Sequence, residues 1–400
     1  MKIMTVLGTR PEIIRLSLII RMLDQNCEHL LVDTGQNYDD RLNGLFFRDL
    51  GVRKPDYCLD VRSGSFGEQV GQILSRIEPL LAEHRPDRLL ILGDTNSGLT
   101  AIVARRMGIP VYHMEAGNRC FDFRVPEEAN RRIIDHISSV LMPYTQRSRE
   151  NLLREGINTA SIFVTGNPIK EVIDHHAEAI NASPALAQLG LASNKYFLVT
   201  MHRAENVDVE SRLRDLVQAL AQLHTEYGYP VVCSLHPRTR ARVKEFGVNL
   251  NRAGLVFVEP FGFFDFVHLE QNAFCLLSDS GTVQEEACIF RVPNVTIRDV
   301  TERPETIECG SNVLAGCDPE TILRLVRLVT ERPADWQPPT EYLATNVAAT
   351  VSRILLGSRV AEEPGLRESL GLRESLGLRE AKDAAALATA PHGSHRHHEK

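Results

Sequence analysis

The sequence predicts an α/β protein built from two Rossmann-like, doubly wound parallel-sheet domains. Short apolar runs alternate with amphipathic stretches from the first residue to about Val329, which is typical of parallel sheets covered by helices. The chain has 400 residues, more than one hydrophobic core usually organises, and this length favours two domains of ordinary size. Charged clusters directly follow two of the apolar runs, at the strand ends where such sheets bind ligands.

The expected elements alternate along both halves of the chain. Five candidate strands lie in the first half, at 2–7, 29–33, 88–92, 110–114 and 161–165. Five more lie in the second half, at 195–200, 230–235, 254–258, 274–277 and 294–297. Helical periodicity fills the gaps, for example from Phe66 to Leu81 and from Arg212 to Leu223, and a last amphipathic helix is expected at 340–356.

The boundary between the two domains is expected at Gly166-Asn-Pro168, because proline can open a helix after a turn. This gives a first domain over 1–167, a second over 168–340, a C-terminal helix over 341–358 and a low-complexity tail over 359–400. The tail repeats Gly-Leu-Arg-Glu-Ser-Leu, and its glycines oppose helix, so it is expected to be disordered or weakly helical. Its terminal histidines would bind metal only adventitiously.

Composition argues against several classes of function. The chain carries 45 Lys and Arg against 52 Asp and Glu, a net charge of −7, so no broad basic surface for nucleic acid is expected. No run reaches the roughly 18 apolar residues that span a bilayer. The eight cysteines contain no C-x-x-C pair, and the first residues lack the apolar core and cleavage site of a signal peptide. We therefore expect a cytoplasmic protein that contacts neither nucleic acid nor membrane.

Two polar clusters predict the site. Residues Glu115 to Arg131, a loop after the strand that ends at Met114, contain four acids and three arginines. A solvated loop with ion pairs would have the same composition. The segment from Thr200 to Asn206 repeats the layout, with His, Arg, Glu and Asn after another apolar strand. Two such clusters on separate strands favour one cleft between two domains.

Two strand-to-helix turns indicate an anionic ligand. In Gly8-Thr-Arg-Pro-Glu12 the glycine permits close approach, Pro11 begins a helix with free N–H groups, and Arg10 can bind phosphate in bidentate fashion. In Ser278 to Glu286 the helix start offers backbone and hydroxyl donors to a diphosphate, while Glu285 or Glu286 can accept hydrogen bonds from ribose. Each segment alone is also compatible with an ordinary capped helix.

A third segment, Leu89-Leu-Ile-Leu-Gly-Asp94, ends a strand with a carboxylate that is either a helix cap or a catalytic acid. Together with the other clusters, this carboxylate completes a set of motifs that resembles the non-hydrolysing UDP-N-acetylglucosamine 2-epimerases over roughly residues 1 to 355. The motifs are Gly8–Glu12, Gly93–Thr95, Glu115–Gly117, Pro126–Arg131, His202–Asn206, Ser278–Glu286 and Thr301–Glu305.

The resemblance implies the glycosyltransferase-B arrangement of the two domains, with a UDP-sugar in the cleft, a UDP-binding second domain and a homodimer. It implies no metal and no nicotinamide cofactor. It also implies that UDP is eliminated across C1–C2 of a 2-acetamido sugar to give a 2-acetamidoglycal. UDP is then added back at C1 after protonation of C2 from the other face, which inverts C2.

Carried over by position, the resemblance also implies the role of each site residue. Proton transfer is assigned to three acids, Asp94, Glu115 and Glu127. Stabilisation of the departing diphosphate is assigned to Arg131 and His202. The sugar nucleotide, its phosphates and its ribose are assigned to Arg10, Ser280, Gly281, Thr282, Glu286 and Arg303. Phe261 and Phe266 match the uracil site, although core packing is the alternative for such aromatic side chains.

Three segments indicate the sugar. Arg15 stands where the common epimerases carry lysine, and a planar guanidinium is no equivalent of a point charge, so Arg15 joins the candidate substrate-binding residues. Arg15–Ser17, Met114–Asp122 and Ser234–Arg240 resemble the branch that converts UDP-2-acetamido-2,6-dideoxy-L-talose to UDP-N-acetyl-L-fucosamine for capsule and O-antigen synthesis. Conversion of UDP-N-acetylglucosamine to UDP-N-acetylmannosamine is the alternative. A hydrolysing epimerase, a retaining glycosyltransferase and a non-catalytic sugar-nucleotide sensor also remain open.

Overall fold

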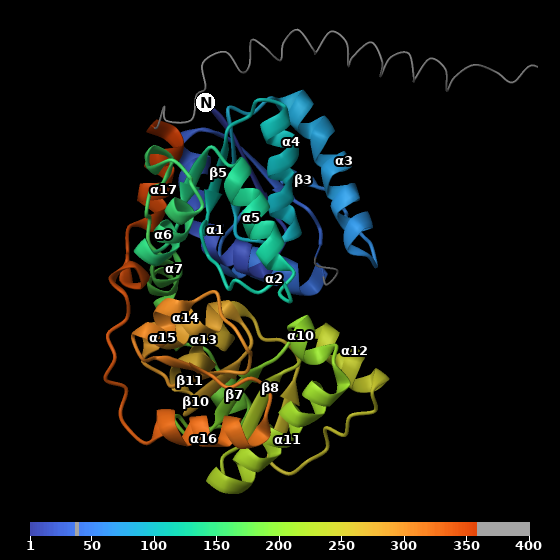
Figure 1. Cartoon of the computed structure of the whole chain (residues 1–400), viewed down its shortest axis with the longest axis vertical. Coiled ribbons are helices and arrows are strands. Elements are labelled where there is room, and N and C mark those ends of the chain that lie inside the picture. Colours follow the sequence, from blue (N-terminus) through green and yellow to red (C-terminus); the bar gives the residue numbers. More distant parts are fainter. Residues whose placement is uncertain (37–39, 358–400) are drawn as a thin grey trace, which may run out of the picture.

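The computed structural model describes residues 1–36 and 40–357 and contains two six-stranded parallel sheets, one in each domain (Figure 1). The first sheet has the order β3-β2-β1-β4-β5-β6. Its strands are β1 (Lys2–Leu7), β2 (Glu28–Asp33), β3 (Tyr57–Cys58), β4 (Arg88–Leu92), β5 (Val111–Met114) and β6 (Val140–Met142).

The second sheet has the order β12-β11-β10-β7-β8-β9, so both sheets follow the strand order of dinucleotide-binding domains. Its strands are β7 (Phe197–Thr200), β8 (Val231–Ser234), β9 (Leu255–Val258), β10 (Cys275–Ser278), β11 (Asn294–Thr296) and β12 (Asn312–Leu314). The predicted fold class, two Rossmann-like domains in the glycosyltransferase-B arrangement, is thus confirmed.

Helices cover both faces of each sheet. The helices up to residue 161 are α1 (Arg10–Asn26), α2 (Asp40–Asp49), α3 (Phe66–His84), η1 (Asn96–Leu99), α4 (Thr100–Arg106), α5 (Glu127–Ile137), α6 (Gln146–Arg154) and η2 (Thr159–Ser161). Those that follow are α7 (Ile169–His175), α8 (Ala177–Asn181), α9 (Ala185–Gln188), α10 (Ala204–Val207), α11 (Glu210–Tyr227), α12 (Pro237–Glu245), α13 (Phe263–Asn272), α14 (Gly281–Phe290), α15 (Pro304–Glu308), α16 (Pro319–Thr330), η3 (Thr340–Leu343) and α17 (Val347–Gly357).

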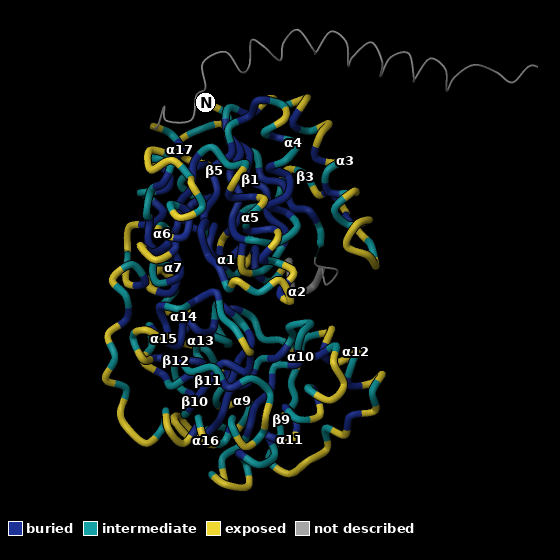
Figure 2. Tube along the Cα trace, viewed as in Figure 1, coloured by how far each residue is buried: buried dark blue, intermediate teal, exposed yellow. Residues whose placement is uncertain are grey.

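The central strands are apolar on both faces because both faces are covered. In β1, Ile3 and Leu7 pack into one core cluster, whereas Met4 and Val6 pack into the cluster on the opposite side of the sheet. All four side chains are fully buried, and Figure 2 shows the buried interior of both domains in dark blue. A continuous apolar run is the pattern that such a strand requires.

All of the predicted strands but one are present. The stretch 161–165 forms no strand, although it lies beside the end of β6, where Leu141 and Ile162 form an isolated bridge and the N–H groups of Phe163 and Thr165 donate to the carbonyls of Leu141 and Pro143. Pro143 has no N–H group with which to extend this ladder. The short β6 takes the expected place at that edge. The expected helix at 340–356 is divided into the 3-10 turn η3 and the helix α17.

The chain crosses between the domains twice. Helix α7 packs against α1 directly after the turn at Gly166, and α17 returns from the second domain to pack against α1 as well (Figure 1). Val351 and Leu355 of α17 join the same core cluster as Leu16 and Ile20 of α1. In the part of the chain that the structure describes, no helix is long and apolar enough to cross a membrane. The tail predicted over 359–400 lies outside the described residues.

Candidate active site

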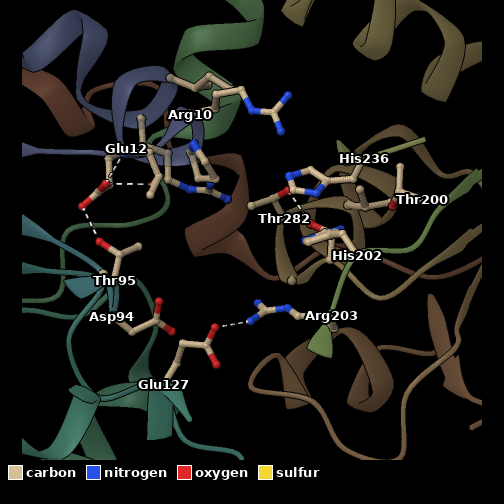
Figure 3. A pocket seen from close by; sticks show the side chains of 18 of the residues that line it. Arg10, Glu12, Asp94, Thr95, Glu127, Thr200, His202, Arg203, His236 and Thr282 are labelled. Carbon is tan, nitrogen blue, oxygen red and sulfur yellow. Dashed lines mark hydrogen bonds and ion pairs between the residues drawn. The ribbon is translucent and has the colours of Figure 1, made fainter. Parts of the chain in front are cut away.

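A cavity of about 640 Å³ lies between the two domains and is lined by residues of both. It opens at the carboxyl ends of β1 and β4 in the first sheet and of β7 and β10 in the second. These strands are neighbours at the two points where the strand order reverses, and open α/β sheets bind ligands at such points. In Figure 3 the acids Asp94 and Glu127 face Arg203, His202 and His236 across this cleft.

The turn after β1 brings Arg10 to the cavity. A Cβ atom at Gly8 would lie 2.0 Å from Oγ1 of Thr34, so only glycine fits there. Helix α1 begins at Arg10 with Pro11 in its first turn, as predicted, and Arg10 lines the cavity with its guanidinium 5.8 Å from the Phe46 ring.

Glu12 is a buried acid in the same turn and had no predicted role. Its Oε2 accepts hydrogen bonds from the backbone N–H groups of Gly8 and Thr9, at 2.9 and 2.7 Å. Its Oε1 accepts from the hydroxyls of Thr95 and Ser97, at 3.0 and 2.5 Å. Burial raises the pKa of Glu12 to about 7 against these hydrogen bonds. Glu12 therefore ties α1 to the loop that carries Asp94.

The three predicted acids lie on one wall of the cavity, and each is paired with an arginine. Asp94 follows β4 and accepts from Nε of Arg131 at 2.9 Å. Glu115 follows β5 and accepts from Nη2 of Arg303 at 2.6 Å. The backbone of Glu115 has φ 62°, a left-handed conformation that costs a non-glycine residue about 1–2 kcal/mol and concentrates at functional sites.

Glu127 begins α5 rather than lying in a loop, which corrects the predicted conformation of the segment up to Arg131. Pro126 precedes the helix, and Glu127 and Glu128 occupy its first turn, where acids interact favourably with the helix dipole. Across the cleft, Nη1 of Arg203 lies 2.8 Å from Oε1 of Glu127. This ion pair joins the two domains and is drawn in Figure 3.

Arg131 and Arg203 occupy different layers of the site. Arg131 is buried behind Asp94, where it also contacts Glu128 at 2.9 Å, and it does not line the cavity. The cation that faces the cavity beside His202 is Arg203, which lay in the predicted motif without an assigned role. Glu302, also unassigned, lies 3.7 Å from Arg203 and 4.0 Å from Arg131. Burial raises the pKa of Glu302, but Arg298 and these two arginines hold it well below its ordinary range.

His202 is held by Asp279 on the wall of the second domain. The Asp279 carboxylate accepts from the backbone N–H of His202 and lies 3.1 Å from its Nδ1. Burial raises the pKa of Asp279, but His202 and backbone N–H groups outweigh it and lower the pKa to about 2. His236 lines the cavity nearby, its ring 5.6 Å from that of His202, and burial, with His202 and Arg10, lowers its pKa to about 4.

The N-terminus of α14 lies at the cavity, which is lined there by Ser280, Gly281 and Thr282. Ser280 precedes the helix and Gly281 begins it, and the hydroxyls of Ser280 and Thr282 lie 3.0 Å apart. A Cβ atom at Gly281 would lie 2.7 Å from Oε1 of Glu302, so a larger residue would displace that carboxylate. Such a helix start, with small residues and hydroxyls, is suited to bind a phosphate.

The structure separates Glu285 from Glu286, which the sequence could not. Glu286 lines the cavity one turn into α14, whereas Glu285 is 1% exposed and lies 2.5 Å from Nη2 of Arg15. Glu285 also contacts Arg303, which in turn contacts Glu115. Arg15, predicted to bind substrate, lines the cavity, but its guanidinium forms an ion pair with Glu285 of the other domain.

Two aromatic side chains border the cavity near α13. Phe261 and Phe266 both line it, and both also pack against the core cluster beneath the second sheet. The two interpretations of these residues, base contact and core packing, are therefore compatible. Among the described residues, no group of three or more His, Cys, Asp and Glu side chains is arranged to hold a metal ion.

Fold and site together define a class of protein. Two Rossmann-like domains enclose a cleft in which acids of one domain face a phosphate-binding helix start and basic side chains of the other. Enzymes with this architecture act on nucleotide-linked substrates held between the domains.

The chain belongs to the UDP-N-acetylglucosamine 2-epimerase family, whose model matches residues 21–356. A UDP-N-acetylglucosamine 2-epimerase of Methanocaldococcus jannaschii is 42% identical over 347 residues, which cover 85% of this chain and 95% of the relative. The structure of a Methanocaldococcus jannaschii UDP-GlcNAc 2-epimerase in complex with UDP-GlcNAc and UDP matches with a TM-score of 0.85 and 40% identity, over 90% of this chain and 100% of that chain.

A Pseudomonas aeruginosa protein, UDP-2,3-diacetamido-2,3-dideoxy-D-glucuronate 2-epimerase, is 38% identical over 82% of this chain and 92% of the relative. The predicted family is confirmed, and with it the class of enzyme, an isomerase that acts as an epimerase. Relatives of comparable identity carry the names of different sugars, so identity near 40% does not fix the sugar.

Proposed function

We propose that this enzyme inverts C2 of a UDP-linked 2-acetamido sugar by eliminating UDP and adding it back. The observation that carries the proposal is the opposition of Asp94, Glu115 and Glu127 to the N-terminus of α14 across one cavity. The names of the relatives, each a 2-epimerase of a UDP-sugar, support the same conclusion.

The cavity offers a subsite for each part of a UDP-sugar. The uracil would lie against Phe261 and Phe266, and the ribose hydroxyls would donate to Glu286. The diphosphate would accept hydrogen bonds from the first turn of α14 and from His202, with Arg10, Arg203 and Arg303 as cations. This pose leaves the sugar ring on the wall that carries the three acids.

The chemistry explains why acids and cations must face each other. The C2 hydrogen of a 2-acetamido sugar is weakly acidic, so a base must remove it as the C1–O bond breaks. The electron pair of the C2–H bond forms the C1–C2 double bond, and the electron pair of the C1–O bond leaves with UDP. The cations stabilise charge that develops on the diphosphate. Protonation of the resulting 2-acetamidoglycal at C2 from the opposite face, with return of UDP to C1, gives the epimer. The two faces of C2 require more than one proton-transfer group, and three acids are available.

Incubation with the UDP-sugar in deuterium oxide tests the reaction type. NMR should find deuterium at C2 of both epimers, with free UDP as a minor product. Free sugar with stoichiometric UDP would identify a hydrolysing epimerase, and transfer to an added acceptor would identify a glycosyltransferase. Binding of UDP without any exchange of the C2 hydrogen would indicate a non-catalytic sugar-nucleotide sensor.

We further propose UDP-2-acetamido-2,6-dideoxy-L-talose as the substrate and UDP-N-acetyl-L-fucosamine as the product. The three segments that resemble this branch all supply residues to the cavity, among them Arg15, Glu115 and Arg238, and this convergence supports the proposal. UDP-N-acetylglucosamine is the second candidate, because the name of the Methanocaldococcus jannaschii relative favours it.

Side-by-side kinetics decide between the two sugars. A pocket that is merely apolar rejects an added hydroxyl by only about 10²-fold, whereas a misplaced C2 hydrogen costs more. The preference should therefore appear mainly in kcat, with similar binding through UDP. Equal or better turnover of UDP-N-acetylglucosamine would overturn the fucosamine assignment.

We also propose that the enzyme works as a homodimer in the cytoplasm. The eight cysteines, all unpaired, support a reducing compartment. Sedimentation equilibrium at micromolar concentration tests the dimer, and a monomer mass would contradict it.

A further inference from the structure

A second buried acid, Glu270, lies behind the proposed ribose subsite. It is on α13, which packs against α14, and its side chain is fully buried. In the described part of the chain, no N–H or O–H group donates a hydrogen bond to either of its carboxyl oxygens. The group that faces Glu270 is the carboxyl of Glu286, which is itself 5% exposed and lines the cavity.

The charges around the two carboxyls are unequal. Arg15 of α1 acts on Glu286, and so does Glu285 of α14, which pairs with that arginine. Helices α2, α8 and α9 also pack against α13, but among the described residues Glu286 is the one charged group that acts on Glu270. Tyr196 is close to Glu270, but its hydroxyl donates to the carbonyl of Leu269 instead. Glu286 therefore has a cation nearby and Glu270 has none.

Two facing, buried carboxylates cannot both remain charged, so the pair must hold a proton. Burial, reinforced by Glu286, raises the pKa of Glu270 well above its ordinary range. Burial also raises the pKa of Glu286, to about 7, but Arg15 opposes the rise at this residue alone. The proton consequently resides on Glu270 and the negative charge on Glu286.

We infer that Glu270 is a positioning residue whose protonated carboxyl donates a hydrogen bond to Glu286 and thereby fixes Glu286 to receive the ribose hydroxyls of UDP. The inference rests on the proposed function, because it requires nucleotide in this cavity. One oxygen of Glu286 is then held by Glu270, and the other remains free to accept from ribose. Removal of the proton would leave two repelling carboxylates and a displaced ribose acceptor.

Binding of UDP should accordingly depend on the proton of Glu270. The affinity should be highest where the pair holds its proton and should fall by up to tenfold per pH unit once the proton is lost. In Glu270→Gln the amide donates to Glu286 at every pH, so the affinity should stay within about threefold of the wild-type maximum and should not share that fall. Glu270→Leu has no donor and should bind UDP more weakly across the whole range.

Isothermal titration of UDP between pH 6 and 9 tests this inference on wild type, Glu270→Gln and Glu270→Leu. The titration of UDP itself cancels in the ratio of wild-type to variant affinity, so the expected result is a ratio that declines as the pH rises. Glu178→Gln, on the exposed surface of α8, is the matched control and should follow the wild-type profile. Titrations in two buffers of different ionisation enthalpy should detect proton uptake by wild type, near the pH where its affinity falls, and none by Glu270→Gln.

A constant ratio of wild-type to Glu270→Gln affinity over the whole pH range would overturn the role of Glu270. If none of the proteins bound UDP at any pH, the proposed function would fail instead, so the two failures are distinguishable. If Glu270→Gln does not fold, the pH profile of UDP affinity in wild type is compared with that of Glu270→Leu instead. The leucine side chain suits the buried position and cannot titrate, so this comparison also tests the role of Glu270. A wild-type profile parallel to that of Glu270→Leu would contradict the inference.

Discussion

Glu285→Gln should be among the most destabilising single changes near the site. Glu285 is 1% exposed and pairs with Arg15 and Arg303, whose side chains are 2% and 5% exposed. Removal of the negative charge of Glu285 leaves these two buried guanidinium groups with less negative charge to balance them. Breaking a buried ion pair by removing one partner costs about 3–5 kcal/mol. For domains of this size a loss of 1 kcal/mol lowers Tm by about 2–4 °C, so we expect a decrease of roughly 6–20 °C.

Differential scanning calorimetry of matched variants measures this effect. Glu226→Gln removes the same charge from an ion pair with Arg327, whose side chain is 55% exposed, and should lower the free energy of unfolding by at most about 1 kcal/mol. Adding Arg15→Met to Glu285→Gln removes one of the two cations that have lost their ion-pair partner, and should recover part of the lost free energy of unfolding. If Glu285→Gln melted no lower than Glu226→Gln, the buried ion pairs of Glu285 would contribute no more to stability than the exposed pair of Glu226 and Arg327.

Three further predictions concern the proposed site. Asp94→Asn and Glu115→Gln keep the shape of the side chain but remove the base, so turnover should fall by roughly 10²-fold or more, whereas calorimetric UDP affinity should change little. Glu286→Ala removes the ribose acceptor and should weaken UDP binding by about 1–3 kcal/mol at neutral pH; unchanged affinity would exclude the assigned role. The folded state raises the pKa of Glu12 from about 4.5 to about 7, so its contribution is complete below about pH 4.5 and is lost as the pH rises through 7. Relative to Glu12→Gln, the wild type should therefore lose about 2.5 kcal/mol of stability between pH 5 and 8, visible as a falling difference in Tm.

The central strands could be predicted from the sequence because a strand buried on both faces is a continuous apolar run. Strands β1, β4, β7 and β10 are of this kind, and their ends locate the cleft. The edge strands β3 and β12 have two and three residues and offer no such run. Strand β6, at the opposite edge of the first sheet, has three residues and is likewise too short to give a recognisable apolar run.

The members of the site could be predicted more readily than their partners. Asp94 and Glu115 are recognisable by their positions after strands and Glu127 by the motif Pro126–Arg131, and all three line the cavity. The pairing of Arg15 with Glu285 joins residues 270 positions apart in different domains, and no local pattern encodes it. The sequence likewise could not tell that Arg131 lies behind Asp94 and that Arg203 faces the cavity, because both are arginines in acidic motifs.

In the proposed reaction, the second carboxylate partners of Arg203 and Arg303 would allow the acids Glu127 and Glu115 to be released for chemistry. An incoming diphosphate would compete with Glu115 for Arg303 and with Glu127 for Arg203, since phosphate and carboxylate bind the same guanidinium donors. Arg303 would then still be paired with Glu285 and Arg203 with Glu302, so neither cation would be left buried without a counter-charge. In this mechanism Glu285 and Glu302 would hold the two arginines in position while Glu115 and Glu127 turn to the sugar, which would couple nucleotide binding to the availability of the bases.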